Sequence, residues 1–271
     1  MNMHDEIDLI NSEIAQSWFA DSDKREVSTK YDKRETSVPK LLIIPMILTY
    51  YRNTFNKMPV NILDVGCGDG ELLNHISHIN SNVNLYGIDP SDEVINKAQI
   101  NVPSGRFHRV SAEDINNINL PKMDIIITYL SFGLWRNKIK GLKNMIDLLS
   151  PQSMLYIIDL NADSYTDAIK TTNSIKEEEY IKEQYNSSLS EEEFKSLLTE
   201  QIELDKFEVI VKVSSLGFSP LSDEYFSAIN NPYVLKCLTS FNSNMTYNKN
   251  SPIINLNHGW LIKNQTLDNP K

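Results

Sequence analysis

The chain has 271 residues, of which 41% are hydrophobic and 23% charged, as expected of one globular domain with an insertion. Its formal net charge is −10, and residues 176–208 carry 11 acidic and 4 basic side chains, so this segment supplies −7 of the total. A nucleic-acid binder would be expected to show a basic face, and none is visible, so we expect no nucleic-acid partner.

Residues 1–59 are predicted to form an N-terminal helical lid segment that leads into the first strand. Residues 1–8 are polar and acidic, unlike a signal peptide, and the chain stays mostly polar up to residue 40. A helix is predicted at Leu41–Phe55, but its apolar part is short and contains Pro45, so we do not expect it to cross a membrane. A cytoplasmic protein with no membrane partner is therefore expected.

Between residues 60 and 160, short apolar runs alternate with amphipathic stretches. This alternation predicts a parallel sheet covered by helices on both faces. The predicted strands are Val60–Val65, Asn84–Asp89, Arg106–Val110, Asp124–Tyr129 and Met154–Leu160. The predicted helices between them cover residues 70–79, 91–100 and 137–149.

Beyond residue 160 the pattern becomes helical and acidic. One helix is predicted at Asp163–Tyr185, and Ser190 with Glu193 forms a capping box that starts another. We therefore predict a helical cap insertion over residues 161–206, after which residues 207–271 return to the sheet. The predicted late strands are Phe207–Val213, Tyr233–Phe241 and His258–Lys263.

The most informative stretch lies where the first strand meets the first helix. Gly66, Gly68 and Gly70 stand at alternate positions there, and glycine is needed where the backbone turns sharply and approaches a ligand. Asp89 ends the next predicted strand, where a carboxylate can accept hydrogen bonds from a ribose. These two features predict a nucleoside-containing cofactor.

Three details separate a dinucleotide from S-adenosylmethionine (SAM). The spacing is G-x-G-x-G, whereas the dinucleotide fingerprint is G-x-G-x-x-G. Asp64 precedes the glycines, and its carboxylate would repel a pyrophosphate but attract the α-ammonium of SAM. The element Ser111–Asp114 can offer amides and an acceptor to an adenine edge. An NAD(P)-dependent oxidoreductase is therefore the weaker alternative.

Four short motifs stand in order within about 100 residues, and they are Asp64–Gly70, Gly87–Ser91, Ser111–Asp114 and Asp124–Tyr129. Together they resemble the successive motifs of the class I, Rossmann-like SAM-dependent methyltransferases over residues 60–160. The resemblance implies a doubly wound α/β fold with a mostly parallel seven-stranded sheet, whose last strand is reversed. The helical cap would follow its fifth strand.

The resemblance also implies that SAM is the cofactor, with its methionine part held at the glycine turn. Asp64 would face the α-ammonium, and the turn would contribute Gly66, Cys67, Gly68 and Gly70. The competing interpretation of Asp64 is a turn or cap residue alone. Cys67 is interpreted as a small turn residue rather than a nucleophile.

At the other end of the cofactor, Asp89 would bind the ribose hydroxyls, and it could also cap the helix that starts near Ser91. Pro90 would pack near the adenine, and Ala112 and Glu113 would frame its edge. Many family members carry Asp where this chain has Ser111, so an acidic neighbour at 113 or 114 would take over the contact to the adenine amine.

The acceptor end is predicted where the fourth strand ends. Tyr129, Phe132 and Trp135 place three aromatic rings in seven residues, with Tyr129 assigned to both cofactor and acceptor. Phe132 and Trp135 would either wall an acceptor pocket or pack the next helix onto the sheet. Tyr31 belongs to an N-terminal segment that would fold over the site as a lid or form a disordered tail.

Other motifs do not lead to a site. Asn230–Tyr233 is similar to the Asn-Pro-Pro-Tyr motif of amide methyltransferases, but it lacks one proline and does not follow the fourth strand. His75 and His78 are expected to be an exposed pair rather than a metal site. The two cysteines form no metal pattern, and we expect no metal.

The prediction is a SAM-dependent methyltransferase that acts on an oxygen, nitrogen or carbon centre of a small-molecule acceptor. Two alternatives keep the fold: a SAM-binding protein that transfers no methyl group, and a methyltransferase whose acidic segment recruits a basic protein substrate. The sequence names neither a catalytic residue nor an oligomeric state.

Overall fold

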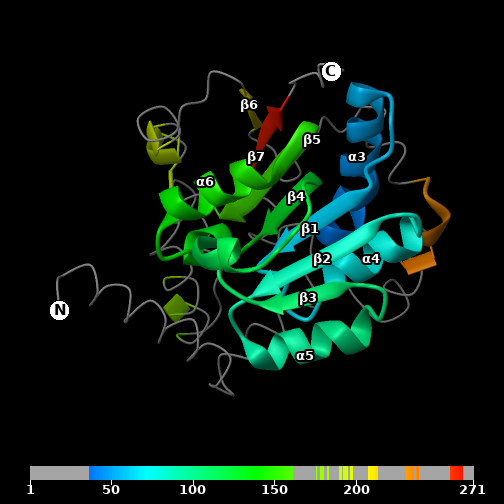
Figure 1. The fold of residues 1–271 in the computed structure, drawn as a ribbon, viewed down its shortest axis with the longest axis horizontal. Coiled ribbons are helices and arrows are strands. Elements are labelled where there is room, and N and C mark those ends of the chain that lie inside the picture. The colour runs from blue at the N-terminus through cyan, green and yellow to red at the C-terminus, as the bar shows by residue number, and fades with distance from the viewer. Residues whose placement is uncertain are drawn as a thin grey trace.

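A computed structural model describes residues 37–160, the backbone of 207–212 and 257–264, and short stretches between 175 and 237. Its centre is one sheet with the strand order β3-β2-β1-β4-β5-β7-β6 (Figure 1). The strands are β1 (Asn61–Val65), β2 (Asn84–Asp89), β3 (Arg106–Arg109), β4 (Met123–Tyr129), β5 (Leu149–Leu160), β6 (Phe207–Lys212) and β7 (Asn257–Asn264). The helices are α3 (Ser37–Phe55), α4 (Glu71–Ile79), α5 (Asp92–Asn101) and α6 (Lys138–Leu148), with 3-10 turns η2 (Ala112–Asn117) and η3 (Phe132–Leu134).

Strands β1 to β5 are all parallel, as predicted. The register pairs Leu63 with Tyr86 of β2 and with Ile126 of β4. All seven residues of β4 are buried, because a central parallel strand is covered on both faces. The five predicted strands and the three helices between them are confirmed, with ends that differ by a few residues.

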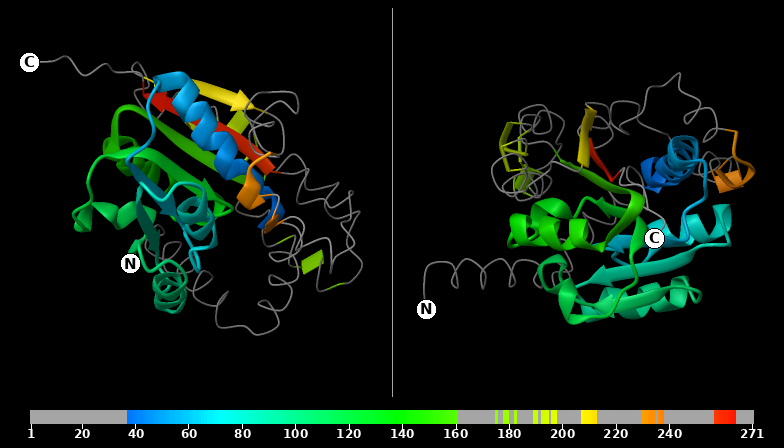
Figure 2. Two further views of the ribbon diagram at one scale, coloured as in Figure 1. Left: turned by 90° about the vertical axis from the view of Figure 1, so that its right-hand side faces the viewer. Right: turned by 45° about the horizontal axis from the view of Figure 1, so that its top comes forward.

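Successive side chains of the strands point to opposite faces, which gives the protein two apolar layers. Ile62 and Ile125 pack with α3 and α4, while Leu63 and Ile126 pack with α6. Helices α3 and α4 therefore cover one face of the sheet and α6 covers the other (Figure 2).

Helix α3, at the end of the predicted N-terminal helical lid segment of residues 1–59, packs in the core. Its apolar residues pack against the sheet, and Leu41, Met46 and Tyr51 are completely buried. The helix is a part of the core because most of its apolar residues are buried, against α4 as well as the sheet. The rest of the predicted lid, including Trp18, Phe19 and Tyr31, lies outside the described residues.

The late part of the chain adds two antiparallel strands and corrects one prediction. The backbone of β7 pairs antiparallel with β5, and that of β6 pairs antiparallel with β7. The predicted strand Tyr233–Phe241 is wrong, because residues 232–234 and 236–237 are helical. Asn231 explains this: its Oδ1 accepts from the amides of Tyr233 (3.0 Å) and Val234 (3.3 Å), as an N-cap residue does.

The capping box at Ser190 is confirmed. The amide of Glu193 donates to Ser190 Oγ at 3.1 Å, and the amide of Ser190 donates to Glu193 Oε2 at 2.8 Å. This reciprocal pair pulls the Glu193 pKa below its ordinary value. The rest of the predicted cap lies largely outside the described residues.

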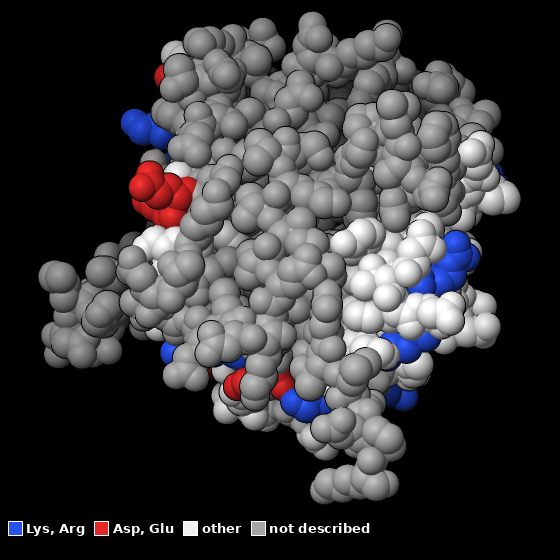
Figure 3. All heavy atoms as spheres, turned by 90° about the horizontal axis from the view of Figure 1, so that it is seen from above, with Lys and Arg blue, Asp and Glu red and all other residues white. Residues whose placement is uncertain are grey.

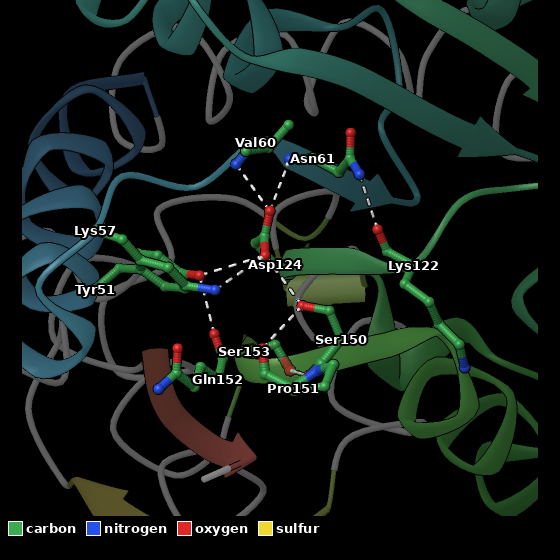
Figure 4. A network of polar contacts seen from close by, with 10 residues as sticks. All are labelled: Tyr51, Lys57, Val60, Asn61, Lys122, Asp124, Ser150, Pro151, Gln152 and Ser153. Carbon is green, nitrogen blue, oxygen red and sulfur yellow. Dashed lines mark hydrogen bonds and ion pairs between the residues drawn. The ribbon is translucent and has the colours of Figure 1, made fainter. Parts of the chain in front are cut away.

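Asp124 joins the amino ends of the central strands (Figure 4). Its Oδ2 accepts from the amides of Val60 (2.8 Å) and Asn61 (3.0 Å). Its Oδ1 accepts from Ser150 Oγ (3.0 Å) and Tyr51 Oη (3.4 Å). One buried carboxylate thus connects α3, β1, β4 and β5 at the edge where the parallel strands begin.

Replacing Asp124 with alanine is expected to lower the free energy of unfolding by about 3–5 kcal/mol, because several buried donors lose their acceptor. Urea denaturation measures this effect. Lys57→Met is the matched control: the Lys57 ammonium lies 3.8 Å from the same carboxylate but its side chain is 41% exposed, so about 0.5 kcal/mol or less is expected. An equal loss in both variants would contradict this role.

Among the described helices, none combines the length and apolar character needed to cross a membrane. On the face shown in Figure 3, the described Lys and Arg side chains lie in separate small groups. The expectation about nucleic-acid partners stays a prediction.

Candidate cofactor site

The predicted cofactor residues come together at the carboxyl ends of β1, β2 and β4. Asp64 on β1 pairs with Gly87 on β2 and with Ile127 on β4. Asp89 ends β2, and Tyr129 ends β4. Parallel strands present their carboxyl ends at one edge of a sheet, so side chains far apart in the sequence share one site.

The glycine turn between β1 and α4 has an unusual backbone. Gly66 and Gly68 have φ angles of 76° and 53°, which glycine adopts without the strain that a Cβ introduces. A Cβ at Gly66 would lie 2.4 Å from both Cβ and Oγ of Ser131. A Cβ at Gly68 would meet nothing within 4 Å. Gly66 is therefore required for packing, whereas Gly68 borders open space.

Asp64 is a buried carboxylate, only 2% exposed. None of the residues that the structure describes donates a hydrogen bond to it. Burial raises the pKa of Asp64 to about 7, opposed by the Lys40 ammonium and reinforced by Asp89. In its ionised form this carboxylate can only accept hydrogen bonds, which suits a cationic ligand.

Asp89 connects the turn to helix α5. Its Oδ2 accepts from the amide of Gly68 at 3.2 Å, and its Oδ1 accepts from the amide of Ser91 at 2.9 Å. Burial raises the Asp89 pKa, and these two amides oppose the shift. Each oxygen keeps a further acceptor position, so Asp89 can hold the turn and also bind ribose hydroxyls. Pro90 beside it is exposed.

The predicted adenine element forms the 3-10 turn η2. Ala112 is buried, and Oε1 of Glu113 accepts from the amide of Asn137 at 2.9 Å. Asp114 accepts from Ser111 Oγ at 3.1 Å and lies 3.2 Å from the Lys140 ammonium. The Glu113 carboxylate thus supports the start of α6, a use that the sequence analysis did not foresee.

The three aromatic rings of the acceptor prediction do not form one wall. Tyr129 packs in the layer of α3 and α4, whereas Phe132 and Trp135 pack in the layer of α6. Phe132 is 1% exposed and lies edge-on to Trp135 and Phe194, with ring centroids 5.1 and 5.7 Å apart. The structure favours packing over the pocket wall for Phe132 and Trp135, and it leaves Tyr129 at the site.

Two further predictions concern a thiol and a histidine pair. Cys67 is buried, and burial raises its pKa, as suits a packing residue rather than a nucleophile. The predicted exposed histidine pair is wrong for His75, which is 9% exposed with Nδ1 2.9 Å from Tyr233 Oη. His78 stacks on Tyr233. Within the described part of the chain, no three His, Cys, Asp or Glu side chains are grouped so as to hold a metal.

Two site residues were missed from the sequence. The Lys40 ammonium on α3 lies 3.0 Å from Glu71 Oε2 and 5.5 Å from the ring centroid of Tyr129. Ser131 Oγ donates to the carbonyl of Val65 at 2.7 Å and lies 2.7 Å from Thr128 Oγ1. No local motif marks either residue, because both act through elements distant in the sequence.

Comparison with known proteins identifies this arrangement. Residues 56–202, more than half of the chain, match the family model described as a methyltransferase domain. The chain belongs to the class I SAM-dependent methyltransferases. The plantazolicin methyltransferase BamL, whose structure has been solved, shares 36% sequence identity with this chain. That match covers 94% of this chain and 96% of BamL, with a TM-score of 0.78.

Two other proteins are similar to this chain. The plantazolicin methyltransferase BpumL is also 36% identical, over 97% of this chain and 100% of BpumL, with a TM-score of 0.76. A putative methyltransferase, 235L of Invertebrate iridescent virus 6, is 27% identical over 122 residues, which are 45% of this chain and 44% of the viral protein. The chain spans about half the length of the curated relatives it matches.

Proposed function

We propose that this methyltransferase transfers the methyl group of SAM to an oxygen, nitrogen or carbon centre of a small molecule that carries azole rings. The supporting observation is the 36% identity with BamL and BpumL over nearly the full length of each chain. Both were solved with S-adenosylhomocysteine (SAH) and an azole-bearing desmethylPZN analogue.

The residues present fit the methionine part of SAM. Asp64 would accept from the α-ammonium, because its buried carboxylate needs a cation there. Lys40 would attract the α-carboxylate, and the open side of Gly68 would let the ligand approach the backbone. Gly66, Cys67 and Gly70 complete the turn. When bound, SAM supplies a methyl group that its sulfonium already activates.

Towards the nucleoside, Asp89 would bind the ribose hydroxyls, and Pro90 would lie against the adenine. Ala112 and the backbone of Glu113 would border the adenine edge. Tyr129, where β4 ends, would face the acceptor. A base is not required of the chain when the acceptor is an amine or an acidified hydroxyl, so its main task is to align the acceptor and exclude water.

The domain organisation is proposed on the same basis. Residues 60–160 would form the SAM-binding core, and 161–206 a helical cap over the acceptor end. Residues 207–271 would complete the seven-stranded sheet of the family. Residues before α3 would act as the lid to which Tyr31 belongs. Phe194, packed on Phe132, supports a cap that rests on the turn after β4.

Two measurements test this function. Isothermal titration of the full chain is expected to show binding of SAM and SAH. Mass spectrometry after incubation with SAM and the triazolic desmethylPZN analogue is expected to show one added methyl group. No SAH binding by a well-folded sample would remove the cofactor assignment. Binding without methylation of any azole-bearing analogue would remove the acceptor assignment alone.

A further inference from the structure

In the turn between β4 and α6, Gly133 is held by two charged side chains, the buried Asp159 and the half-buried Lys138. The amide of Gly133 donates to Asp159 Oδ2 at 2.7 Å. The carbonyl of Gly133 accepts from Lys138 Nζ at 2.7 Å, and the same ammonium reaches the carbonyl of Trp135 at 3.4 Å. Both backbone polar groups of Gly133 are therefore held by charge-assisted hydrogen bonds, which are stronger than neutral ones.

A third charged side chain, the buried Glu113, joins this arrangement from η2. The Glu113 carboxylate, 7% exposed, accepts from the amide of Asn137, the residue before Lys138. The Asn144 amide group on α6 donates to the carbonyls of Ala112 and Glu113, at 3.1 and 2.9 Å. Helix α6 thus begins on η2 and carries the ammonium that holds the turn.

The charges of the three side chains influence one another. Burial lowers the pKa of Lys138, while the negative charges of Asp159 and Glu113 raise it. Burying the carboxylates of Glu113 and Asp159 and half-burying the Lys138 ammonium is costly, since desolvating an ion costs up to several kcal/mol, and apolar packing often stabilises a fold equally well. A polar cluster whose burial is costly, and which binds backbone groups, is expected where the position of a turn has to be fixed.

We infer that Glu113, Lys138 and Asp159 form a charge clamp that aligns the turn after β4 with the adenine end of the cofactor site. Lys138 is its central positioning residue. The inference rests on the proposed function, which assigns Ala112 and Glu113 to the adenine edge. Adenine bound there would restrict the motion of η2. Because Glu113 contacts the start of α6, and Lys138 on α6 binds Gly133, the position of Gly133 would be restricted as well. Asp159, at the end of β5, holds the other side of Gly133.

Hydrogen–deuterium exchange of the full chain with and without SAH tests the clamp. In the wild type, SAH is expected to slow amide exchange in residues 130–137. Lys138→Met removes the ammonium but keeps the aliphatic stem. It should retain SAH affinity within about threefold and lose about four-fifths of that SAH-dependent protection. Lys138→Arg keeps the charge and should restore the protection.

The chain offers a matched control two residues away. Lys140→Met removes an exposed ammonium that pairs with Asp114 at 3.2 Å, and it should behave as the wild type. Asp159→Asn weakens the hydrogen bond to the amide of Gly133 and should lose the same SAH-dependent protection. This second variant keeps the test decisive if Lys138→Met does not fold.

Three results would overturn the inference. One is full protection of residues 130–137 in both Lys138→Met and Asp159→Asn. A second is SAH binding to the wild type with no protection of this segment. The third is a loss of SAH affinity beyond about tenfold in Lys138→Met, which would make Lys138 part of the cofactor site instead. Failure of the wild type to bind SAH would remove the proposed function and the clamp together.

Discussion

Asp64→Asn is expected to lose SAM binding by about 100-fold or more while making the unliganded protein more stable at pH 8. The carboxylate is 2% exposed, and its pKa is raised to about 7 by burial. Asparagine keeps the shape but cannot neutralise the α-ammonium, and an unpaired buried charge in a complex costs about 2–5 kcal/mol. One substitution should therefore move affinity and stability in opposite directions.

The pH dependence follows from the direction of the pKa shift. The folded-state pKa of Asp64, about 7, lies above its ordinary value of 3.8, so the folded protein binds more protons between these values. The stability contribution of Asp64 is therefore present at low pH and is lost as the pH rises through 7. SAM binding has the opposite trend, because the carboxylate must ionise. The affinity should fall up to about tenfold per pH unit below 7.

Calorimetry and thermal melts between pH 5.5 and 8.5 measure both effects. The Tm of unliganded Asp64→Asn should exceed that of the wild type by a few degrees at pH 8, and this difference should shrink at pH 5.5. Asp147→Asn, an exposed position on α6, is the control and should change neither quantity. Wild-type SAM affinity in Asp64→Asn would contradict the role of this carboxylate.

Replacing Gly66 or Gly68 of the same turn with alanine is expected to affect different properties, the first mainly stability and the second mainly ligand binding. In Gly66→Ala the new Cβ would lie 2.4 Å from Ser131, which is tied to Val65 and Thr128, so the turn cannot give way cheaply. A loss of about 2–5 kcal/mol in the free energy of unfolding is expected. In Gly68→Ala the Cβ meets no protein atom within 4 Å. Only the cost of a positive φ, about 1–2 kcal/mol, should remain.

The ligand readout separates the two variants. Gly68→Ala places a methyl group in the open space beside the turn and should weaken SAH binding about tenfold or more, although the protein stays folded. The double variant Gly66→Ala/Ser131→Gly removes the clashing Cβ and should recover part of the stability lost in Gly66→Ala. Urea denaturation and SAH titration measure these effects. Unchanged SAH affinity in Gly68→Ala would show that the ligand does not approach this side of the turn.

Local sequence predicted the parallel core because each signal there is local. Strand β4 is a continuous apolar run, and α4 follows the glycine turn with Leu72, Leu73 and Ile76 on one face. The capping box at Ser190 is likewise a four-residue pattern, and it formed as predicted. Asn231 shows the limit: an Asn-Pro start was present in the sequence, but the apolar residues after it indicated a strand.

The placement of aromatic and polar side chains could not be predicted in the same way. Phe132 and Trp135 are close to Tyr129 in sequence, yet the chain crosses the edge of the sheet between them and they pack in the opposite layer. His75 is buried and contacts Tyr233, which is distant in the sequence. Periodicity assigns a residue to a face of its own element and carries no information about what another element brings there.

By itself the sequence determined the order of strands and helices between residues 60 and 160, the glycine turn and the acidic residues that predict SAM, because these depend on neighbours within a few residues. Only the tertiary structure decided that α3 belongs to the core, that Lys40 stands near Asp64, and that Glu113, Lys138 and Asp159 meet around one turn. The physical reason is that packing and charge depend on distance in space. Elements far apart in the chain make these contacts only when the folded sheet places the carboxyl ends of its strands side by side at one edge.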